Sequence, residues 1–134
     1  MSHRRSLAVL AALILSASVA AQTDDWSGAR PLTLNLSSFK FDPSQIMLEH
    51  GAPYRLHLVN SSSRGHDFAA KQFFAAARIR PEDAAKVKDG RIKVGGGESV
   101  DVQLIAPSAP GTYKVRCTHF MHSAFGMTGR VVVQ

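Results

Sequence analysis

A short segment near the C-terminus carries three side chains of the kind that bind soft metal ions. Cys117 supplies a thiol, His122 an imidazole five positions later, and Met127 a thioether five positions after that. Thiolate and thioether ligands favour copper, and two histidines, a cysteine and a weak axial methionine form the ligand set of a blue-copper site. The pattern therefore predicts a copper site whose second histidine comes from upstream, where His66 is the best placed.

The cysteine count strengthens this interpretation. Cys117 is the only cysteine among the 134 residues, so it cannot form an internal disulfide. In an oxidising compartment a lone thiol is buried and inert, paired between chains, or held by a metal. The neighbouring histidines and methionine favour the metal. Zinc accepts the same cysteine and histidine ligands, and the thioether of Met127 is what favours copper over zinc.

The first 21 residues have the composition of a cleavable signal peptide. A basic start at His3-Arg4-Arg5 precedes an apolar stretch from Leu7 to Leu15, and small residues at 18–21 provide a cleavage site. The apolar stretch is shorter than the roughly 20 residues of a spanning helix, which disfavours an uncleaved membrane anchor. We expect a periplasmic or otherwise exported protein without a membrane span after signal cleavage. Residues 22–30 then form a flexible segment, and residues 31–134 form one domain.

Charge limits the range of partners. The formal net charge is +6, and Arg4 and Arg5 of the predicted signal peptide contribute to it. The remaining basic residues are scattered rather than clustered in sequence, which argues against nucleic-acid binding. A partner protein with an acidic docking surface remains compatible with this charge. We expect a monomer.

Short strands must position the candidate ligands. Apolar and polar residues alternate in several runs that are separated by Gly, Pro, Asn and Ser, which is typical of strands. The runs lie at 32–36, 54–58, 100–104 and 112–117. In the last of them Cys117 shares a face with Tyr113 and Val115, so we expect the thiol to point inward at the end of a core strand.

The middle of the chain has a different pattern. Residues 71–78 favour a helix, and residues 81–88 begin with Pro81 and acidic residues and end with basic residues before Gly90, which are helix start and stop signals. Together with the strands, this predicts an all-β sandwich with a short helical insertion around residues 71–88.

At this point the sequence resembles the cupredoxin family of type 1 copper proteins. The Cys-x4-His-x4-Met spacing is most similar to that of rusticyanin, and Gly126-Met127-Thr-Gly129 before a valine-rich strand is also family-like. The resemblance extends over Leu32 to Gln134. It implies a Greek-key β-sandwich that holds one type 1 copper ion. The implied ligands are His66, Cys117 and His122, with Met127 as the weak axial ligand.

Two residues depart from the family pattern. Asp67 follows the first histidine, where the family often has Asn or Ser that hydrogen-bonds toward the cysteine loop, and its charge would affect the reduction potential. His119 is a spare histidine close to Cys117. His122 is favoured as the ligand because it keeps the family spacing to Met127, which leaves His119 as a surface residue or as an additional metal ligand.

Three classes of function follow from a copper site. The resemblance implies a one-electron carrier that cycles Cu(I)/Cu(II) with a redox partner protein. The alternative is copper sequestration or delivery, which His119 and Met121 beside the site favour. We do not expect an enzyme, because Thr118 replaces the histidine that commonly connects a type 1 site to a second copper centre, and one cysteine is too few for a binuclear centre.

Overall fold

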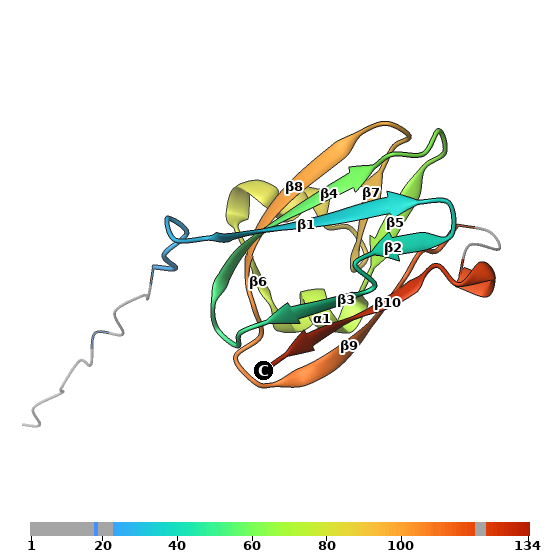
Figure 1. Cartoon of the computed structure of the whole chain (residues 1–134). Helices are drawn as coiled ribbons and strands as arrows, with labels where there is room; N and C mark the ends of the chain where they lie inside the picture. The colour runs from blue at the N-terminus through green and yellow to red at the C-terminus, as the bar shows by residue number, and fades with distance from the viewer. Residues whose placement is uncertain (1–17, 19–22, 120–122) are drawn as a thin grey trace, which may run out of the picture.

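The computed structural model describes residue 18 and residues 23–119 and 123–134, which form two β-sheets packed face to face (Figure 1). The first sheet has the order β2 (Lys40–Asp42), β1 (Arg30–Ser37), β4 (Pro53–Asn60), β8 (Ser99–Ile105), β6 (Arg78–Ile79). The second has the order β3 (Gln45–Leu48), β10 (Thr128–Val133), β9 (Gly111–Arg116), β5 (His66–Ala69), β7 (Arg91–Val94). The predicted all-β sandwich with a helical insertion is confirmed.

The chain crosses between the sheets repeatedly. Strand β1 pairs in parallel with β4, and β10 pairs in parallel with β3, whereas the other strand pairs are antiparallel. Parallel neighbours need long connections, and here each connection includes at least one strand of the opposite sheet. Strand β5 follows the loop after β4 and lies in the second sheet between β7 and β9.

The space between the sheets is filled by the inward-facing residues of the alternating runs. Tyr54, Leu56 and Leu58 of β4 are buried, as the alternation predicted, while Arg55 is exposed. Aromatic side chains contribute edge-to-face contacts, because the ring of Phe68 on β5 has its centroid 6.0 Å from that of Phe41 and 5.9 Å from that of Phe74. Such geometry is the favoured one for buried aromatic pairs.

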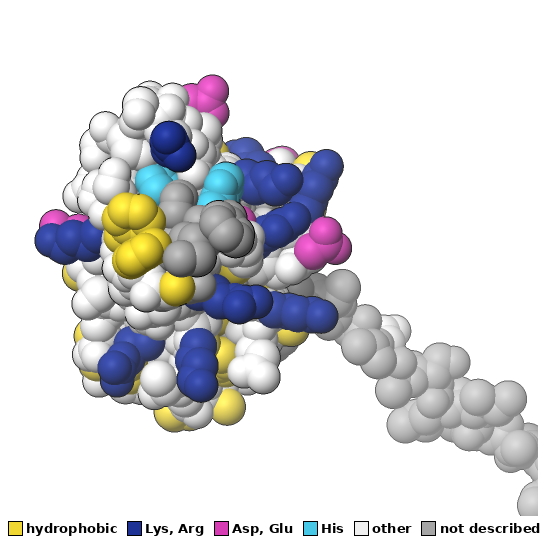
Figure 2. All heavy atoms as spheres, turned by 90° about the vertical axis from the view of Figure 1, so that its right-hand side faces the viewer, with side chains coloured by type: hydrophobic (Ala, Val, Ile, Leu, Met, Phe, Trp, Pro, Cys, Tyr) yellow, Lys and Arg dark blue, Asp and Glu magenta, His cyan; other side chains and the backbone are white. Residues whose placement is uncertain are grey.

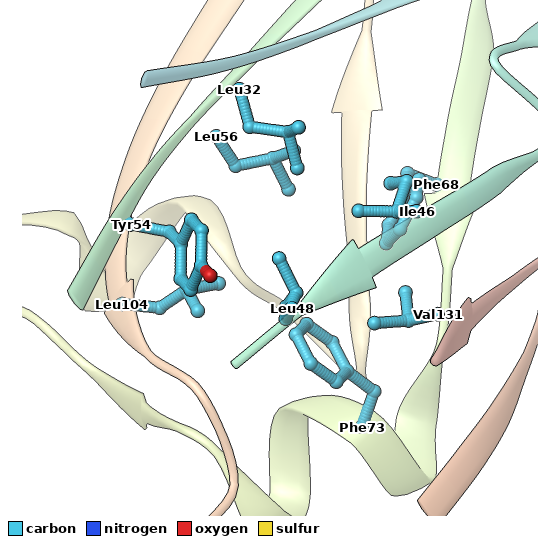
Figure 3. A pocket seen from close by; sticks show the side chains of 9 residues that line it. All are labelled: Leu32, Ile46, Leu48, Tyr54, Leu56, Phe68, Phe73, Leu104 and Val131. Atoms are coloured by element: carbon cyan, nitrogen blue, oxygen red, sulfur yellow. The ribbon is translucent and has the colours of Figure 1, made fainter. Parts of the chain in front are cut away.

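A small cavity lies among these apolar side chains (Figure 3). Its volume is about 10 Å³, near the minimum for one water molecule. The lining residues are Leu32, Ile46, Leu48, Tyr54, Leu56, Phe68, Phe73, Leu104 and Val131. The hydroxyl of Tyr54 already accepts a hydrogen bond from the backbone N–H of Glu49 at 2.9 Å. The cavity is therefore an apolar packing gap rather than a ligand site.

The helical insertion is shorter than predicted. Helix α1 (Lys71–Ala76) buries Phe73 and Phe74 against the core, and it ends early because Arg78 and Ile79 pair with β8 as strand β6. The second predicted helix is a 3₁₀-helix, η1 (Pro81–Lys86). Among the described residues, no helix has both the length and the apolar character needed to cross a membrane.

A buried carboxylate attaches η1 to the first sheet. Asp83 accepts hydrogen bonds from the backbone N–H of Gln103 at 2.9 Å, from Nε of Arg80 at 3.1 Å and from Nζ of Lys86 at 2.5 Å. Burial raises the pKa of Asp83, but the hydrogen bonds from Lys86, Gln103 and Arg80 outweigh burial and hold the pKa below 3.8. Asp83 is therefore ionised at neutral pH and stabilises the folded state in that form.

We predict that Asp83→Asn lowers the free energy of unfolding at pH 7 by about 2 kcal/mol, the scale of hydrogen bonds to a charged group. Because the pKa of Asp83 is lower in the folded than in the unfolded protein, its stabilisation is complete above pH 4 and is lost at lower pH. The difference between the two proteins should therefore shrink below pH 4 in urea titrations. Glu82→Gln, at an exposed neighbour, is the control, and an equal loss in both variants would contradict the assignment.

Candidate metal centre

Strand pairing brings two of the predicted ligands together. His66 is the first residue of β5, and Cys117 follows the last residue of β9, in a register that pairs Ala69 with Arg116. Both side chains face the core, where their exposed fractions are 2% and 0%. Nδ1 of His66 lies 3.9 Å from Sγ of Cys117 although the residues are 51 positions apart.

The environment of the thiol disfavours a bare thiolate. Burial raises the pKa of Cys117, and the nearby carboxylate of Asp67 raises it further. Two backbone N–H groups act in the opposite direction, from Asp67 at 3.5 Å from Sγ and from His119. A cation in the site would compensate the buried negative charge of the thiolate, and its binding would release the proton.

The ring of His66 is oriented by Ser62. Nε2 of His66 lies 2.8 Å from Oγ of Ser62, whose single hydroxyl proton has acceptors in Oδ1 of Asn60 and the carbonyl of Arg64. Oγ therefore accepts the Nε2–H of His66, and the lone pair of the neutral ring lies on Nδ1, which faces Cys117. Metal-binding histidines are commonly oriented by such a hydrogen bond on the second nitrogen.

The loop that carries Ser62 is itself fixed. The buried amide of Asn60 donates to the carbonyls of Val94 at 3.1 Å and Gly95 at 3.0 Å. A Cβ at Gly96 would lie 2.3 Å from the carbonyl oxygen of Ser63, so only glycine allows this close approach. The sequence shows these residues as parts of a polar loop and a glycine-rich turn, and nothing in that pattern indicates that they support His66.

The loop after Cys117 returns to it at Met127. The backbone N–H of Cys117 donates to the carbonyl of Met127 at 3.1 Å, and the side chain of Met127 is fully buried. Gly126 has φ = +93°, a conformation that favours glycine, and it precedes Met127 directly. His122 lies outside the described residues, together with Met121. Within the described part of the chain, no group of three His, Cys, Asp or Glu side chains is placed to hold a metal ion.

Asp67 binds the cysteine loop from the outer side of the sheet. Its carboxylate accepts the backbone N–H of Thr118 at 2.6 Å and also the hydroxyl of Thr118. Nη1 of Arg91 lies 3.1 Å from that hydroxyl oxygen and 3.9 Å from the Asp67 carboxylate, which is almost fully buried. The resemblance implied that an Asn or Ser after the first histidine would hydrogen-bond toward the cysteine loop. Here the carboxylate of Asp67 makes that contact.

His119 lies close to the site but on its exposed side. The centroid of the His119 ring is 6.4 Å from that of the His66 ring, and His119 is exposed to solvent. The structure therefore keeps an imidazole within reach of the site, in addition to the backbone N–H that His119 donates to the thiol.

The distance between the two strong donors fits a shared metal ion. Metal–sulfur and metal–nitrogen bonds of about 2.3 and 2.0–2.1 Å separate the two donor atoms by about 3.6 Å at a tetrahedral angle and about 3.8 Å at a trigonal angle. The observed separation of 3.9 Å is close to the trigonal value. A buried thiol, an oriented imidazole and a buried thioether are donors that suit copper.

Comparisons with solved structures support the fold. The auracyanin of Roseiflexus castenholzii is 22% identical, with a TM-score of 0.58 over 80% of this chain and 99% of that chain. Auracyanin A of Chloroflexus aurantiacus, described as a blue copper protein, is also 22% identical, with a TM-score of 0.53 over 78% of this chain and 99% of that chain. The multicopper oxidase McoA of Aquifex aeolicus is 12% identical, with a TM-score of 0.64 over 84% of this chain but 31% of that chain.

A family comparison goes further than the fold. No curated protein sequence matches the chain. The model of the copper binding proteins of the plastocyanin/azurin family matches residues 31–134, which include every predicted ligand. The chain therefore belongs to the plastocyanin/azurin family of copper-binding proteins, as the resemblance to cupredoxins implied.

Proposed function

We propose that the protein is an exported one-electron carrier with a single copper ion held by His66, Cys117, His122 and Met127. The observation that carries this proposal is the buried Sγ of Cys117 facing Nδ1 of His66 at 3.9 Å. Membership of a copper-binding family supports the choice of metal. His122 enters on its spacing in the sequence, since it lies outside the described residues.

The bound copper would supply one-electron redox chemistry, and the chain's own residues would set its environment. Cys117 gives the charged ligand, and the N–H groups of Asp67 and His119 stabilise negative charge on its sulfur. The hydrogen bond to Ser62 fixes the ring of His66. Ligands that the sandwich already holds need to move little between oxidation states, which favours fast electron exchange.

Copper sequestration or delivery is the second candidate. The ring of His119, exposed and 6.4 Å from that of His66, favours it, because an accessible imidazole near the site offers a route for metal exchange. A carrier of this kind would release copper readily, whereas an electron carrier should retain copper in both oxidation states.

The two candidates can be separated by voltammetry of the copper-loaded protein together with a chelator challenge. We expect a reversible one-electron wave and slow loss of copper to chelators for Cu(I) and for Cu(II), since the described ligands are buried. Rapid loss of copper in either oxidation state, without a reversible wave, would contradict electron transfer and favour copper handling.

Met127→Leu should keep the copper but raise its reduction potential in the same voltammetry, because the variant lacks a weak electron donor.

We also predict that Asp67→Asn raises the reduction potential. A buried negative charge beside the site stabilises Cu(II) over Cu(I), and Arg91 compensates it only in part, with 3.9 Å between the charged groups. A partly compensated unit charge at an effective dielectric constant of about 20 corresponds to a shift on the order of 50 mV. Voltammetry of the two proteins measures this shift directly.

Asp101→Asn is the matched control for this prediction. Asp101 is a half-exposed carboxylate on β8 of the other sheet, where it pairs with His57 at 2.9 Å. Screening by solvent should keep the effect of Asp101 on the potential small. An equal shift in both variants, or a lower potential in Asp67→Asn, would show that the charge of Asp67 does not act on the copper.

A further inference from the structure

The outer face of the second sheet gathers basic side chains. On β9 and β10 the positions that alternate with the buried valines are occupied by exposed residues, among them Lys114, Arg116 and Arg130. Arg91 and Lys93 of β7 extend the same face. Figure 2 shows one end of the sandwich, where Lys and Arg side chains gather beside and below exposed histidine side chains, with few Asp or Glu side chains among them. These residues are scattered in the sequence, and the strand pairing brings them together.

These side chains line a hollow rather than a flat surface. A groove of about 1080 Å³ runs over β9 and β10 toward the start of α1. Its basic lining residues are Lys71, Arg91, Lys114, Arg116 and Arg130, and Asp89 is the acidic residue that lines it. We call this region the basic groove.

The arrangement has a cost for folding. Lys114 and Arg130 are direct cross-strand partners in the antiparallel pair of β9 and β10. Like charges in this position destabilise a sheet. Among the described residues, no carboxylate lies within ion-pair distance of Lys114, Arg116 or Arg130, whereas some exposed charges elsewhere are paired, as in Arg30 with Glu49. An acidic partner would provide the missing opposite charge.

We propose that the basic groove docks an acidic segment of a partner protein. The proposal rests on the proposed function, because an electron carrier must meet a redox partner. Charge complementarity identifies an acidic segment as the occupant. The concave shape favours a protruding loop or strand over a planar membrane surface, which would contact the rim of the groove and leave its interior empty.

The basic groove is connected to the metal site. Thr118, which lines the groove, directly follows Cys117 and hydrogen-bonds Asp67. Arg91 also lines the groove and contacts the hydroxyl of Thr118. A partner bound here therefore lies one residue from the thiolate ligand in the chain, which gives the electron a short path.

The test uses a fluorescently labelled oligo-glutamate peptide as the probe, with binding followed by fluorescence anisotropy at low salt. The double variant Lys114→Gln/Arg130→Gln should weaken binding about ten-fold, because it removes two charges from the groove. The control Lys40→Gln/Arg55→Gln removes the same net charge from exposed positions of the other sheet and should change binding less than about two-fold. Binding should also weaken as salt approaches 0.15 M.

Several outcomes would overturn the proposal. An equal loss of peptide affinity in the control variant and the groove variant would show a general effect of charge. Unchanged peptide affinity in the groove variant would show that the peptide binds outside the basic groove. Stronger binding of anionic vesicles or duplex DNA than of the peptide would identify a different class of partner. Thermal melting checks that the groove variant is folded, and we expect its Tm to rise slightly because a like-charge pair is removed.

The same titration distinguishes failure of this proposal from failure of the proposed function. The groove and its charges belong to the polypeptide, so the peptide should bind the metal-free protein as well as the copper-loaded protein. Peptide binding without reversible copper redox chemistry would support the docking proposal and contradict the proposed electron-carrier function. Reversible redox chemistry without peptide binding would support the electron-carrier function and contradict the docking proposal.

Discussion

The antiparallel pairing of β5 with β9 is the constraint on which the described part of the site depends. Side chains of a strand alternate between its two faces, so this one pairing directs His66 and Cys117 into the core and Asp67 and Thr118 to the outer side. The hydrogen bonds of the outer pair fix the register of the inner pair. A shift of one residue in the register of β5 against β9 would turn the thiol out of the core. Because the register is fixed in this way, a strand of four residues is long enough to position the site.

The electrostatics of the site follow from the same arrangement. The thiol is buried, and burial raises its pKa, so a cation in the site would favour negative charge on the sulfur. On the outer side, Asp67 adds a fixed negative charge that Arg91 partly neutralises. Arg91 also lines the basic groove, so the residue that balances the charge beside the metal site lies on the surface where we expect an acidic partner.

Sequence patterns predicted the elements that obey simple alternation or carry ligand chemistry. The inward direction of Cys117 and the apolar face of β4 could be predicted, because solvent covers the opposite face of these strands. Strand β5 could not, since His66, Asp67 and Phe68 are all buried and no alternation remains. Arg91 and Thr118 cover its outer side. The support of His66 by Ser62 and Asn60 depends on contacts between distant segments, which a single polar loop does not reveal.

The central claim is that Cys117 and His66 hold copper together with a ligand from the loop that follows Cys117. Visible absorption and EPR spectra after addition of one equivalent of Cu(II) test it most directly, with Cys117→Ala, His122→Ala and His119→Ala beside the parent protein. We expect an intense thiolate-to-copper band with a mononuclear signal, lost in the first two variants and kept in His119→Ala. A colourless protein with an ordinary copper signal, or a band that survives Cys117→Ala, would contradict the account.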